Sequence, residues 1–313
     1  MHLDSKPHVS VILTSYNQAA YLPAALHSIR KQSYQDFEVI AVDDGSTDES
    51  LDILRSFERE NKPGIRVCGA GGENRGLVAT YATGVSEAAG DYLAFLEADD
   101  MWTPNYLAEK VRVLDRLSEV GVVFSPCRFL LEGCFGLDML IRQRVLQWLL
   151  PRQEPFDNFK WLLRKNNVAT FSAFVVRAEL VRSVPLPADL RLCFYDWWLL
   201  THLSLRAKFY FDTHGYTTWR HHRQSFIGKQ AFADHRQVLT EFLEALYISV
   251  DQDLSCRNGV LQEHFSRRRR GQRRFVSFYR QCGFRNWVRF FHEDPLWALE
   301  TLLSYTVNGF KFS

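Results

Sequence analysis

Three carboxylates stand at the end of an apolar run in this sequence. Residues 92–96 read Tyr-Leu-Ala-Phe-Leu, a pattern typical of a buried strand, and Glu97, Asp99 and Asp100 follow within four positions. Carboxylates held this close repel one another. The spacing therefore predicts either a cation among them or full solvation of the group.

Similar polar clusters follow other apolar runs of the first 130 residues. The runs occupy residues 9–14, 37–42, 65–70, 92–97 and 120–125, and helix-like segments with apolar residues three and four apart separate them. The clusters read TSYNQ, DDGSTD, GGENRG and EADD. Each alone is typical of an ordinary loop. Together they favour a ligand site, because the carboxyl ends of parallel strands meet at one edge.

The alternation of strands and helices predicts an α/β fold. We expect a mostly parallel central sheet with helices on both faces. Ser46 followed by Glu49 has the spacing of a capping box, and Thr103 before Pro104 is typical of a cap followed by the first helical residue. These pairs predict where two of the helices begin.

The type of ligand follows from what these clusters lack. No GxGxxG follows the first strand, and the glycine-rich stretch after the third lacks the Gly-Lys-Ser/Thr of a P-loop. Carboxylates can hold a diphosphate only through a divalent cation that bridges the two sets of anions. The predicted cation is therefore a divalent metal carrying a nucleotide diphosphate.

Composition is ordinary for a globular protein. The chain has 313 residues, of which 46% are hydrophobic and 24% charged. Its six cysteines form no CxxC pair, so a reducing compartment is favoured over a zinc site or a disulfide framework. The first residues lack the apolar core of a secretory signal, and no long uncharged apolar stretch predicts a membrane span. We expect a cytoplasmic protein.

Charge divides the chain into two parts. Residues 1–125 hold 11 Lys and Arg against 19 Asp and Glu, or −8, and residues 126–313 hold 27 against 17, or +10. Residues 267–289 contain nine arginines, no acid and interleaved aromatics. This composition favours an anionic membrane surface, on the inner face of the cell membrane, over nucleic acid. A solvated helix with its aromatics packed on the catalytic domain stays an alternative, and the apolar stripe beyond is compatible with a homodimer.

Several spaced motifs together resemble a known family. VSVILTSYNQAAYLPAALHSIRKQSYQDFEVIAVDDGSTDES, then ENRGL, then GDYLAFLEADDMWTPNYLAEKV are similar to the family 2 glycosyltransferases, which have the GT-A fold. The strong match covers about 110 residues, and weaker similarity continues to about residue 226. The resemblance implies a catalytic domain over 1–228, with a nucleotide-binding half at about 1–125 and an acceptor half at about 126–228. A helical, Arg- and aromatic-rich region would occupy 229–313.

The resemblance also implies a donor pocket. The residues that would contact the nucleotide sugar are Thr14, Tyr16, Asn17, Asp44, Asn74, Gly76, Glu97, Arg220 and Ser225. Among them, Asp44 would accept a hydrogen bond from the base or ribose. Arg220 and Ser225 fall on an Arg-x-His-x-x-Ser pattern, whose histidine is His222. The stretch LVATYATG departs from the family pattern, and no role follows from it.

Metal and base are implied in the same way. Glu97 and Asp99 occupy the Asp-x-Asp positions, so Asp99 would bind the divalent metal, Mn²⁺ or Mg²⁺, with His222 as a metal or diphosphate contact. Glu97 is one methylene longer than the usual Asp, which moves its charge. Asp196 in LCFYDWWLL would be the catalytic base. Its other reading is the cap of a helix beginning at Trp197, since aspartate is a favoured cap.

The function expected from the resemblance is inverting sugar transfer. A nucleotide-diphosphate sugar would be the donor, and a hydroxyl of a saccharide or lipid-linked saccharide the acceptor, in polysaccharide biosynthesis at the cell envelope. A nucleotide-sugar-binding protein without turnover is an alternative that Glu97 favours. A nucleotidyltransferase is a further alternative, but it would need a Gly-rich, Lys-bearing loop after the first strand, which the sequence lacks.

Overall fold

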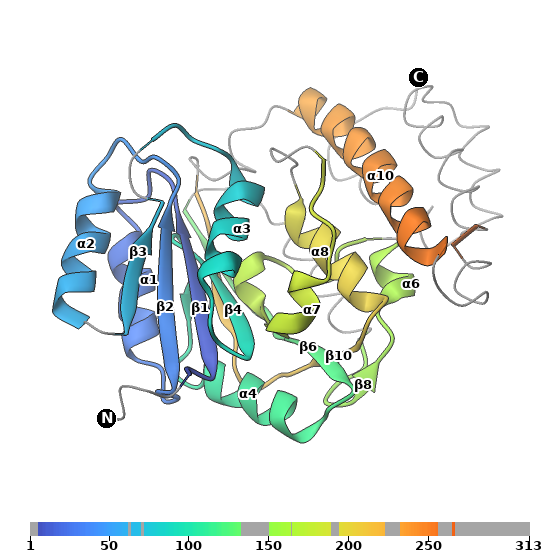
Figure 1. Ribbon diagram of the computed structural model, residues 1–313, viewed down its shortest axis with the longest axis horizontal. Coiled ribbons are helices and arrows are strands. Elements are labelled where there is room, and N and C mark those ends of the chain that lie inside the picture. The colour runs from blue at the N-terminus through green and yellow to red at the C-terminus, as the bar shows by residue number, and fades with distance from the viewer. Residues whose placement is uncertain are drawn as a thin grey trace. The chain divides into compact units, whose positions relative to one another are not determined.

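The computed structural model describes residues 6–61, 64–69, 72–132, 150–163, 165–188, 194–222, 232–255 and 265–266. An eight-stranded sheet with strand order β3-β2-β1-β4-β9-β6-β10-β8 forms its centre (Figure 1). The strands of this sheet are β1 (Val9–Ser15), β2 (Phe37–Asp43), β3 (Ile65–Cys68), β4 (Tyr92–Glu97), β6 (Val120–Phe124), β8 (Pro155–Phe156), β9 (Phe174–Arg177) and β10 (Lys208–Phe211). The five apolar runs of the first 130 residues all form strands, as predicted.

The sheet is mixed but mostly parallel, which confirms the predicted fold class. Strands β3, β2, β1 and β4 run parallel, and β6 runs parallel to β10. Strand β9 lies antiparallel between β4 and β6, and the short β8 is antiparallel to β10. The carboxyl ends of β1, β2 and β4 therefore share one edge of the sheet.

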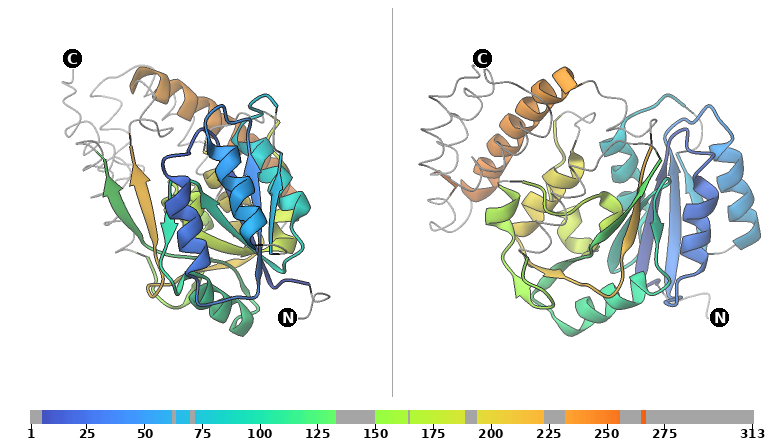
Figure 2. Two further views of the ribbon diagram at one scale, coloured as in Figure 1. Left: turned by 90° about the vertical axis from the view of Figure 1, so that its left-hand side faces the viewer. Right: turned by 180° about the vertical axis from the view of Figure 1, so that it is seen from behind.

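Helices cover both faces of the sheet, again as predicted. The helices are α1 (Leu22–Arg30), α2 (Ser50–Asn61), α3 (Leu77–Glu87), α4 (Tyr106–Arg116), α6 (Phe159–Leu162), α7 (Ala178–Arg182) and α8 (Tyr195–Ser204), with a 3-10 turn, η1, at Phe171–Ala173. Val11 and Leu13 on β1 face the core made with α1, α2 and α4. Ile12 faces α3, where a Cβ added to Gly84 would lie 2.4 Å from its side chain. Figures 1 and 2 show α3 and the α1–α2 pair on opposite sides of the strands.

Two predicted helix starts are wrong. Helix α2 begins at Ser50, and the side chain of Asp48 accepts a hydrogen bond from the Ser50 backbone N–H at 3.0 Å. Ser46 instead donates its hydroxyl to Asp43. Helix α4 begins at Tyr106, three residues after Thr103, whose backbone carbonyl accepts the Tyr106 N–H at 3.0 Å. In both cases the polar residues form a turn that precedes the helix.

A second sheet of three strands carries later residues of the chain. Its order is β5 (Met101–Trp102), β11 (Thr217–His221) and β7 (Cys127–Leu131). Lys110 on α4 anchors the turn before β11, and its side chain is fully buried. Its ammonium donates to Asp212 Oδ2 at 2.6 Å and to the Gly215 carbonyl at 2.9 Å. This buried ion pair sets where β11 begins.

The chain divides into two compact units, Met1–Lys229 and Gln230–Ser313. Helix α10 (Phe232–Ser255) is the main described element of the second unit. Among the helices that the structure describes, none combines the length and apolar character needed to cross a bilayer. The arginine-rich residues 267–289 and Ser225 lie outside the described residues.

Candidate functional site

The carboxylate cluster forms at the end of β4. Glu97 is the last residue of the strand, and its Oε2 accepts the Thr170 hydroxyl at 2.7 Å. The same hydroxyl lies 3.3 Å from Asp100 Oδ2, and Asp100 Oδ1 accepts the backbone N–H of Arg220 at 3.0 Å. Asp100 is fully buried. A single buried hydroxyl thus links two of the three carboxylates.

The cluster carries more negative charge than its surroundings compensate. Burial, with the charge of Asp99 as the next largest cause, raises the pKa of Glu97 to about 8. Burial also raises the pKa of Asp100 well above its ordinary value, and the charges of Asp99 and Glu97 add to the effect. Both shifts have the same origin, which is crowding of carboxylates away from water. A divalent cation would relieve this repulsion.

His222 lies directly against Asp99. Its Nε2 is 3.0 Å from Asp99 Oδ2, with 2% of the histidine side chain and 17% of the aspartate side chain exposed. The ring of Tyr21 packs on the imidazole, with 4.3 Å between centroids. Asp99 and His222 are 123 residues apart in the chain, and the structure brings together this predicted pair of metal ligands. The carboxylate oxygen is a donor that suits Mn²⁺ or Mg²⁺, and an imidazole nitrogen is a common ligand of divalent transition metals.

Arg220 connects β11 to the same cluster. Besides the backbone bond to Asp100, its Nε donates to the carbonyl of Asp99 at 3.1 Å. Its guanidinium forms an ion pair with Glu132 and lies 4.9 Å from the centroid of the Tyr21 ring. These contacts hold the Arg220 guanidinium beside the carboxylates, where an anionic ligand could reach it.

The predicted pocket residues of β1 lie at the same edge of the sheet. Thr14 is buried and pairs in register with Glu97 across the β1–β4 ladder. Tyr16 is 42% exposed. Asn17 has a left-handed backbone, with φ of 52°, and its side-chain oxygen accepts the Thr47 N–H at 2.8 Å. The end of β1 is therefore tied to the loop that follows β2.

Asp44 fixes the next loop. It is 6% exposed, and its two carboxylate oxygens accept the backbone N–H groups of Arg75 at 2.9 Å and Gly76 at 3.0 Å. Gly76 has φ of 91° and precedes α3, which explains a glycine at this position. Asn74 is exposed. Each carboxylate oxygen of Asp44 thus accepts one hydrogen bond from the protein, and each has a further lone pair that can accept a hydrogen bond from a ligand.

Asp196 lies in the first turn of α8. The helix begins at Tyr195 and its N-cap is Phe194, two residues before Asp196, so the alternative reading of Asp196 as the cap is wrong. Asn166 donates its amide to Asp196 Oδ2 at 2.7 Å. Burial raises the pKa of Asp196 to about 6, against hydrogen bonds from the Trp197 N–H and Asn166 that lower it. The charge of Asp196 in turn raises the pKa of Glu97, so the two carboxylates belong to one electrostatic site.

Several residues of the site have no sequence signal. Asn166, Thr170 and Ser172 precede β9, and Tyr21 and Glu132 contact Arg220. Each reaches a partner that is at least 30 residues away in the chain, and the Tyr21–Glu132 and Arg220–Glu132 contacts span 111 and 88 residues. Common polar residues at such separations form no recognisable motif.

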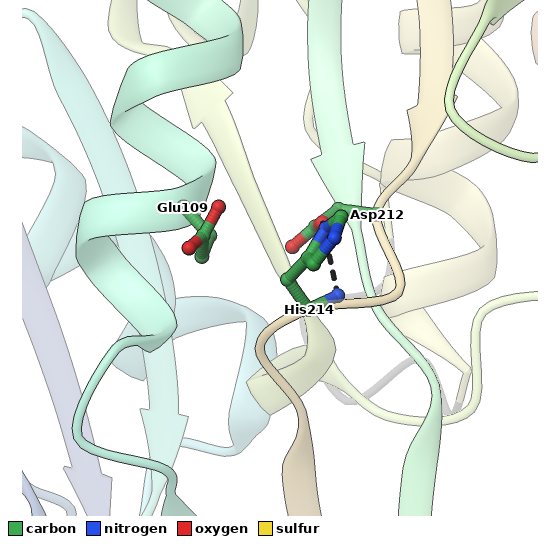
Figure 3. Close-up of side chains that lie close together, drawn as sticks. All are labelled: Glu109, Asp212 and His214. Carbon is green, nitrogen blue, oxygen red and sulfur yellow. Dashed lines mark hydrogen bonds and ion pairs between the residues drawn. The ribbon is translucent and has the colours of Figure 1, made fainter.

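A second group of metal-ligand types lies on α4 and the turn before β11 (Figure 3). One ligand atom each of Glu109, Asp212 and His214 falls within 4.8 Å of the others. Asp212 Oδ2 already accepts the ammonium of Lys110, and Oδ1 lies 3.1 Å from His214 Nδ1. The lysine supplies the positive charge that a metal would bring. This group therefore reads as a structural ion pair with a histidine attached.

Comparison with known proteins identifies the type of chain. The model of Glycosyl transferase family 2 matches residues 10–184. An uncharacterized glycosyltransferase of Nostoc sp. is 36% identical over 115 residues, which are 37% of this chain and 35% of that protein. The putative teichuronic acid biosynthesis glycosyltransferase of Bacillus subtilis is 38% identical over 120 residues, 38% of this chain and 46% of that protein. The chain thus aligns with less than half the length of these two relatives.

Solved structures show the same fold at low identity. S. aureus TarS residues 1–349, in complex with UDP-GlcNAc, has a TM-score of 0.60 and 18% identity, and the match covers 95% of this chain and 86% of that one. The mannosyltransferase PcManGT of Pyrobaculum calidifontis, in complex with GDP-Man and Mn²⁺, has a TM-score of 0.54 and 18% identity. That match covers 79% of this chain and 65% of the other. Similarity at this level supports the GT-A fold.

Proposed function

Since the chain belongs to glycosyl transferase family 2, we propose that it is an inverting glycosyltransferase. It moves a sugar from a nucleotide-diphosphate donor to a hydroxyl of a saccharide or lipid-linked saccharide. The observation that carries this proposal is the convergence of the Asp99–His222 pair and Asp196 on one site at the carboxyl edge of the sheet. The pair suits a metal-bound diphosphate and Asp196 suits a base.

The donor binds along the ends of β1, β2 and β4. Thr14, Asn17 and Asp44 line the base and ribose side, and Arg220 faces the diphosphate. Asp99 and His222 would hold the divalent metal, because the crowded carboxylates and the adjacent imidazole offer oxygen and nitrogen donors to a cation. When bound, the metal neutralises charge on the leaving diphosphate.

Asp196 acts as the general base. With a pKa of about 6 it is mostly ionised at neutral pH and can still accept a proton. The acceptor oxygen attacks the anomeric carbon from the side opposite the diphosphate, so the new glycosidic bond forms as the bond to the diphosphate breaks. Asp196 takes the hydroxyl proton. The oxocarbenium-like charge in the transition state is that of inverting hydrolysis, with a sugar hydroxyl in place of water.

The test uses the donors bound by the structural relatives. UDP-GlcNAc and GDP-mannose, with further UDP-sugars, are titrated by calorimetry with Mn²⁺ and with chelator, and release of nucleoside diphosphate is followed with a panel of saccharide acceptors. We expect metal-dependent binding of at least one donor and release of its nucleoside diphosphate. Binding without release under all conditions would favour the alternative of a binding protein without turnover.

The proposed lipid-linked acceptor is inferred from the sequence of residues 267–289, which lie outside the described residues. Nine arginines without an acid would attract anionic lipid, at about 1 kcal/mol for each arginine near the surface. A lipid-linked acceptor at the inner face of the membrane accounts for this charge, and one relative is named as a putative teichuronic acid biosynthesis glycosyltransferase. Vesicle co-sedimentation of the whole chain, against a truncation ending near residue 264, tests the idea. Equal sedimentation of both, or no dependence on lipid charge, would contradict it.

A further inference from the structure

A buried connecting segment, which ends in the first residues of η1, runs beside the carboxylate cluster. We call residues 166–172, which enter η1 and then β9, the 166–172 segment. All of its residues except the partly exposed Asn166 are buried. Connecting segments usually lie on the surface, because buried backbone and side-chain polar groups need partners. The partners of this segment are therefore informative about its role.

The C-terminal end of the 166–172 segment is hydrogen-bonded to the carboxylate cluster at the end of β4. Thr170 donates its hydroxyl to Glu97, and the Ser172 hydroxyl accepts the backbone N–H of Glu97 at 3.0 Å. The Ser172 carbonyl accepts the indole N–H of Trp102 and the hydroxyl of Thr217, both at 2.7 Å. Four elements, β4, β5, η1 and β11, are thus joined at this point.

The N-terminal end of the segment contacts Asp196 through a single amide. Asn166 Nδ2 donates to Asp196 Oδ2 at 2.7 Å, while Asn166 Oδ1 accepts the backbone N–H of Val168 at 3.1 Å. The bond from Val168 fixes which end of the amide faces which partner. Asn166 therefore presents a donor to Asp196, and rotation of the amide would cost both bonds.

The neighbouring residue anchors the segment. Asn167 and Asn158 are both buried and exchange two side-chain hydrogen bonds, of 2.7 Å and 3.1 Å. Phe171 stacks on Tyr81 of α3, with 3.9 Å between ring centroids. A chain held at both ends in this way presents Asn166 in one place.

We propose that Asn166 is a positioning residue for Asp196, which orients the Asp196 carboxylate for proton transfer. Through the 166–172 segment, Asn166 also links Asp196 to the carboxylates of Glu97 and Asp100. The inference rests on the proposed role of Asp196 as the base. The donated hydrogen bond stabilises the ionised carboxylate and holds one of its oxygens, and a carboxylate has acceptor sites left for the incoming hydroxyl. Sequence resemblance gave Asn166 no role.

The surroundings of Asp196 make this donor important. Its carboxylate interacts electrostatically with Glu97 on β4 and with the phenol of Tyr81 on α3. Neither group favours a second negative charge. Hydrogen bonds from the Trp197 N–H, from Asn166 and from the backbone of Asp196 itself lower the pKa of Asp196 against the effect of burial. Loss of Asn166 should therefore make the carboxylate harder to ionise.

The experiment follows the titration of Asp196 in the whole chain without any ligand. The ¹³C signal of the Asp196 carboxyl is assigned by its absence in Asp196→Asn. The pH midpoint of its titration is then compared in wild type, Asn166→Ala and Asn166→Asp. The second variant is isosteric and keeps the oxygen that accepts the Val168 N–H. Asn167→Ala is the matched control, since it deletes a buried amide one residue away that has no bond to Asp196. The acid limb of donor cleavage is recorded in parallel with UDP-GlcNAc and GDP-mannose.

We expect both Asn166 variants to raise the Asp196 midpoint by about one unit or more, and to move the acid limb of cleavage to higher pH by the same amount. Turnover should fall about tenfold or more with donor affinity unchanged. Asn167→Ala should lower the melting temperature but leave the midpoint in place. An unchanged midpoint in both Asn166 variants, with Asp196→Asn inactive, would overturn the positioning role alone. An active Asp196→Asn would instead overturn the proposed base, and with it this inference.

Discussion

Replacing Asp196 by Asn should stabilise the protein while it removes activity. The pKa of Asp196 rises from an ordinary 3.8 to about 6 in the folded chain, chiefly through burial. The folded state therefore binds a proton more tightly than the unfolded state, so the free energy of unfolding falls as pH rises from about 4 to about 6. A shift of this size at about 1.4 kcal/mol per unit corresponds to about 3 kcal/mol at neutral pH.

Asparagine has no charge to bury. Asp196→Asn should therefore raise the free energy of unfolding at pH 7.5 by about 1 to 3 kcal/mol, and by much less at pH 4, where the wild-type carboxyl is already protonated. The lower figure applies if the single amide oxygen cannot accept bonds from both Asn166 and the Trp197 N–H. Turnover should fall by about 10² to 10⁴ with donor affinity nearly unchanged, as for loss of a positioned base.

Urea denaturation at the two pH values, with calorimetric donor titration and a turnover assay, measures all three quantities. Asp48→Asn is a control of opposite sign. Burial alone would raise the pKa of Asp48, but hydrogen bonds from Ser50 and from the Ala19 N–H lower it overall, so this replacement should not stabilise the chain. If Asp196→Asn lost stability, donor affinity and turnover together, Asp196 would be a structural residue and the reasoning would be refuted.

Further predictions concern the metal, Glu97 and the ion pair beneath β11. Asp99→Asn should abolish turnover and weaken nucleotide-diphosphate binding in Mn²⁺; equal affinity with metal and with chelator would exclude a metal role. Glu97→Asp restores the usual family residue, and we expect activity to be retained or changed modestly, whereas complete loss would mean that the longer side chain is required at this site. Lys110→Met removes the ammonium that pairs with the buried Asp212, which keeps only its contacts with the turn residues, and should cost about 3 to 5 kcal/mol in urea denaturation. Adding Asp212→Leu should recover part of that loss, and no recovery would mean that Lys110 acts through packing.

The central sheet was predictable from the sequence, because its strands are local patterns. The run from Tyr92 to Leu96 is apolar since both faces of β4 are covered, and the same holds for β1 and β2. Strand β9 was missed. Its four residues are a short apolar run that periodicity cannot distinguish from a helix segment, and its antiparallel place between β4 and β6 depends on pairing with distant strands.

The candidate site was predictable only where a motif carried it. Asp99, His222 and Asp196 came from resemblance, and the structure brings the first two to 3.0 Å. Asn166 and Thr170 were not predictable, since an ordinary amide and hydroxyl acquire a role only through partners 30 and 73 residues away. The helix starts failed for a related reason. Serine is a residue type that favours N-caps, but the Ser46 hydroxyl donates a hydrogen bond to Asp43 in a local turn instead.

Donor cleavage with identification of the released nucleotide tests the central claim most directly. Wild type, Asp99→Asn and Asp196→Asn are incubated with UDP-GlcNAc, GDP-mannose and further nucleotide-diphosphate sugars, with Mn²⁺ or with chelator and a panel of saccharide acceptors, and the nucleotides are separated chromatographically. We predict that the wild-type chain releases a nucleoside diphosphate from at least one donor, that chelator and Asp99→Asn abolish the release, and that Asp196→Asn slows it by about 10² to 10⁴. Release of a nucleoside monophosphate, or cleavage that survives both substitutions and chelator, would contradict a metal-assisted sugar transferase with Asp196 as its base.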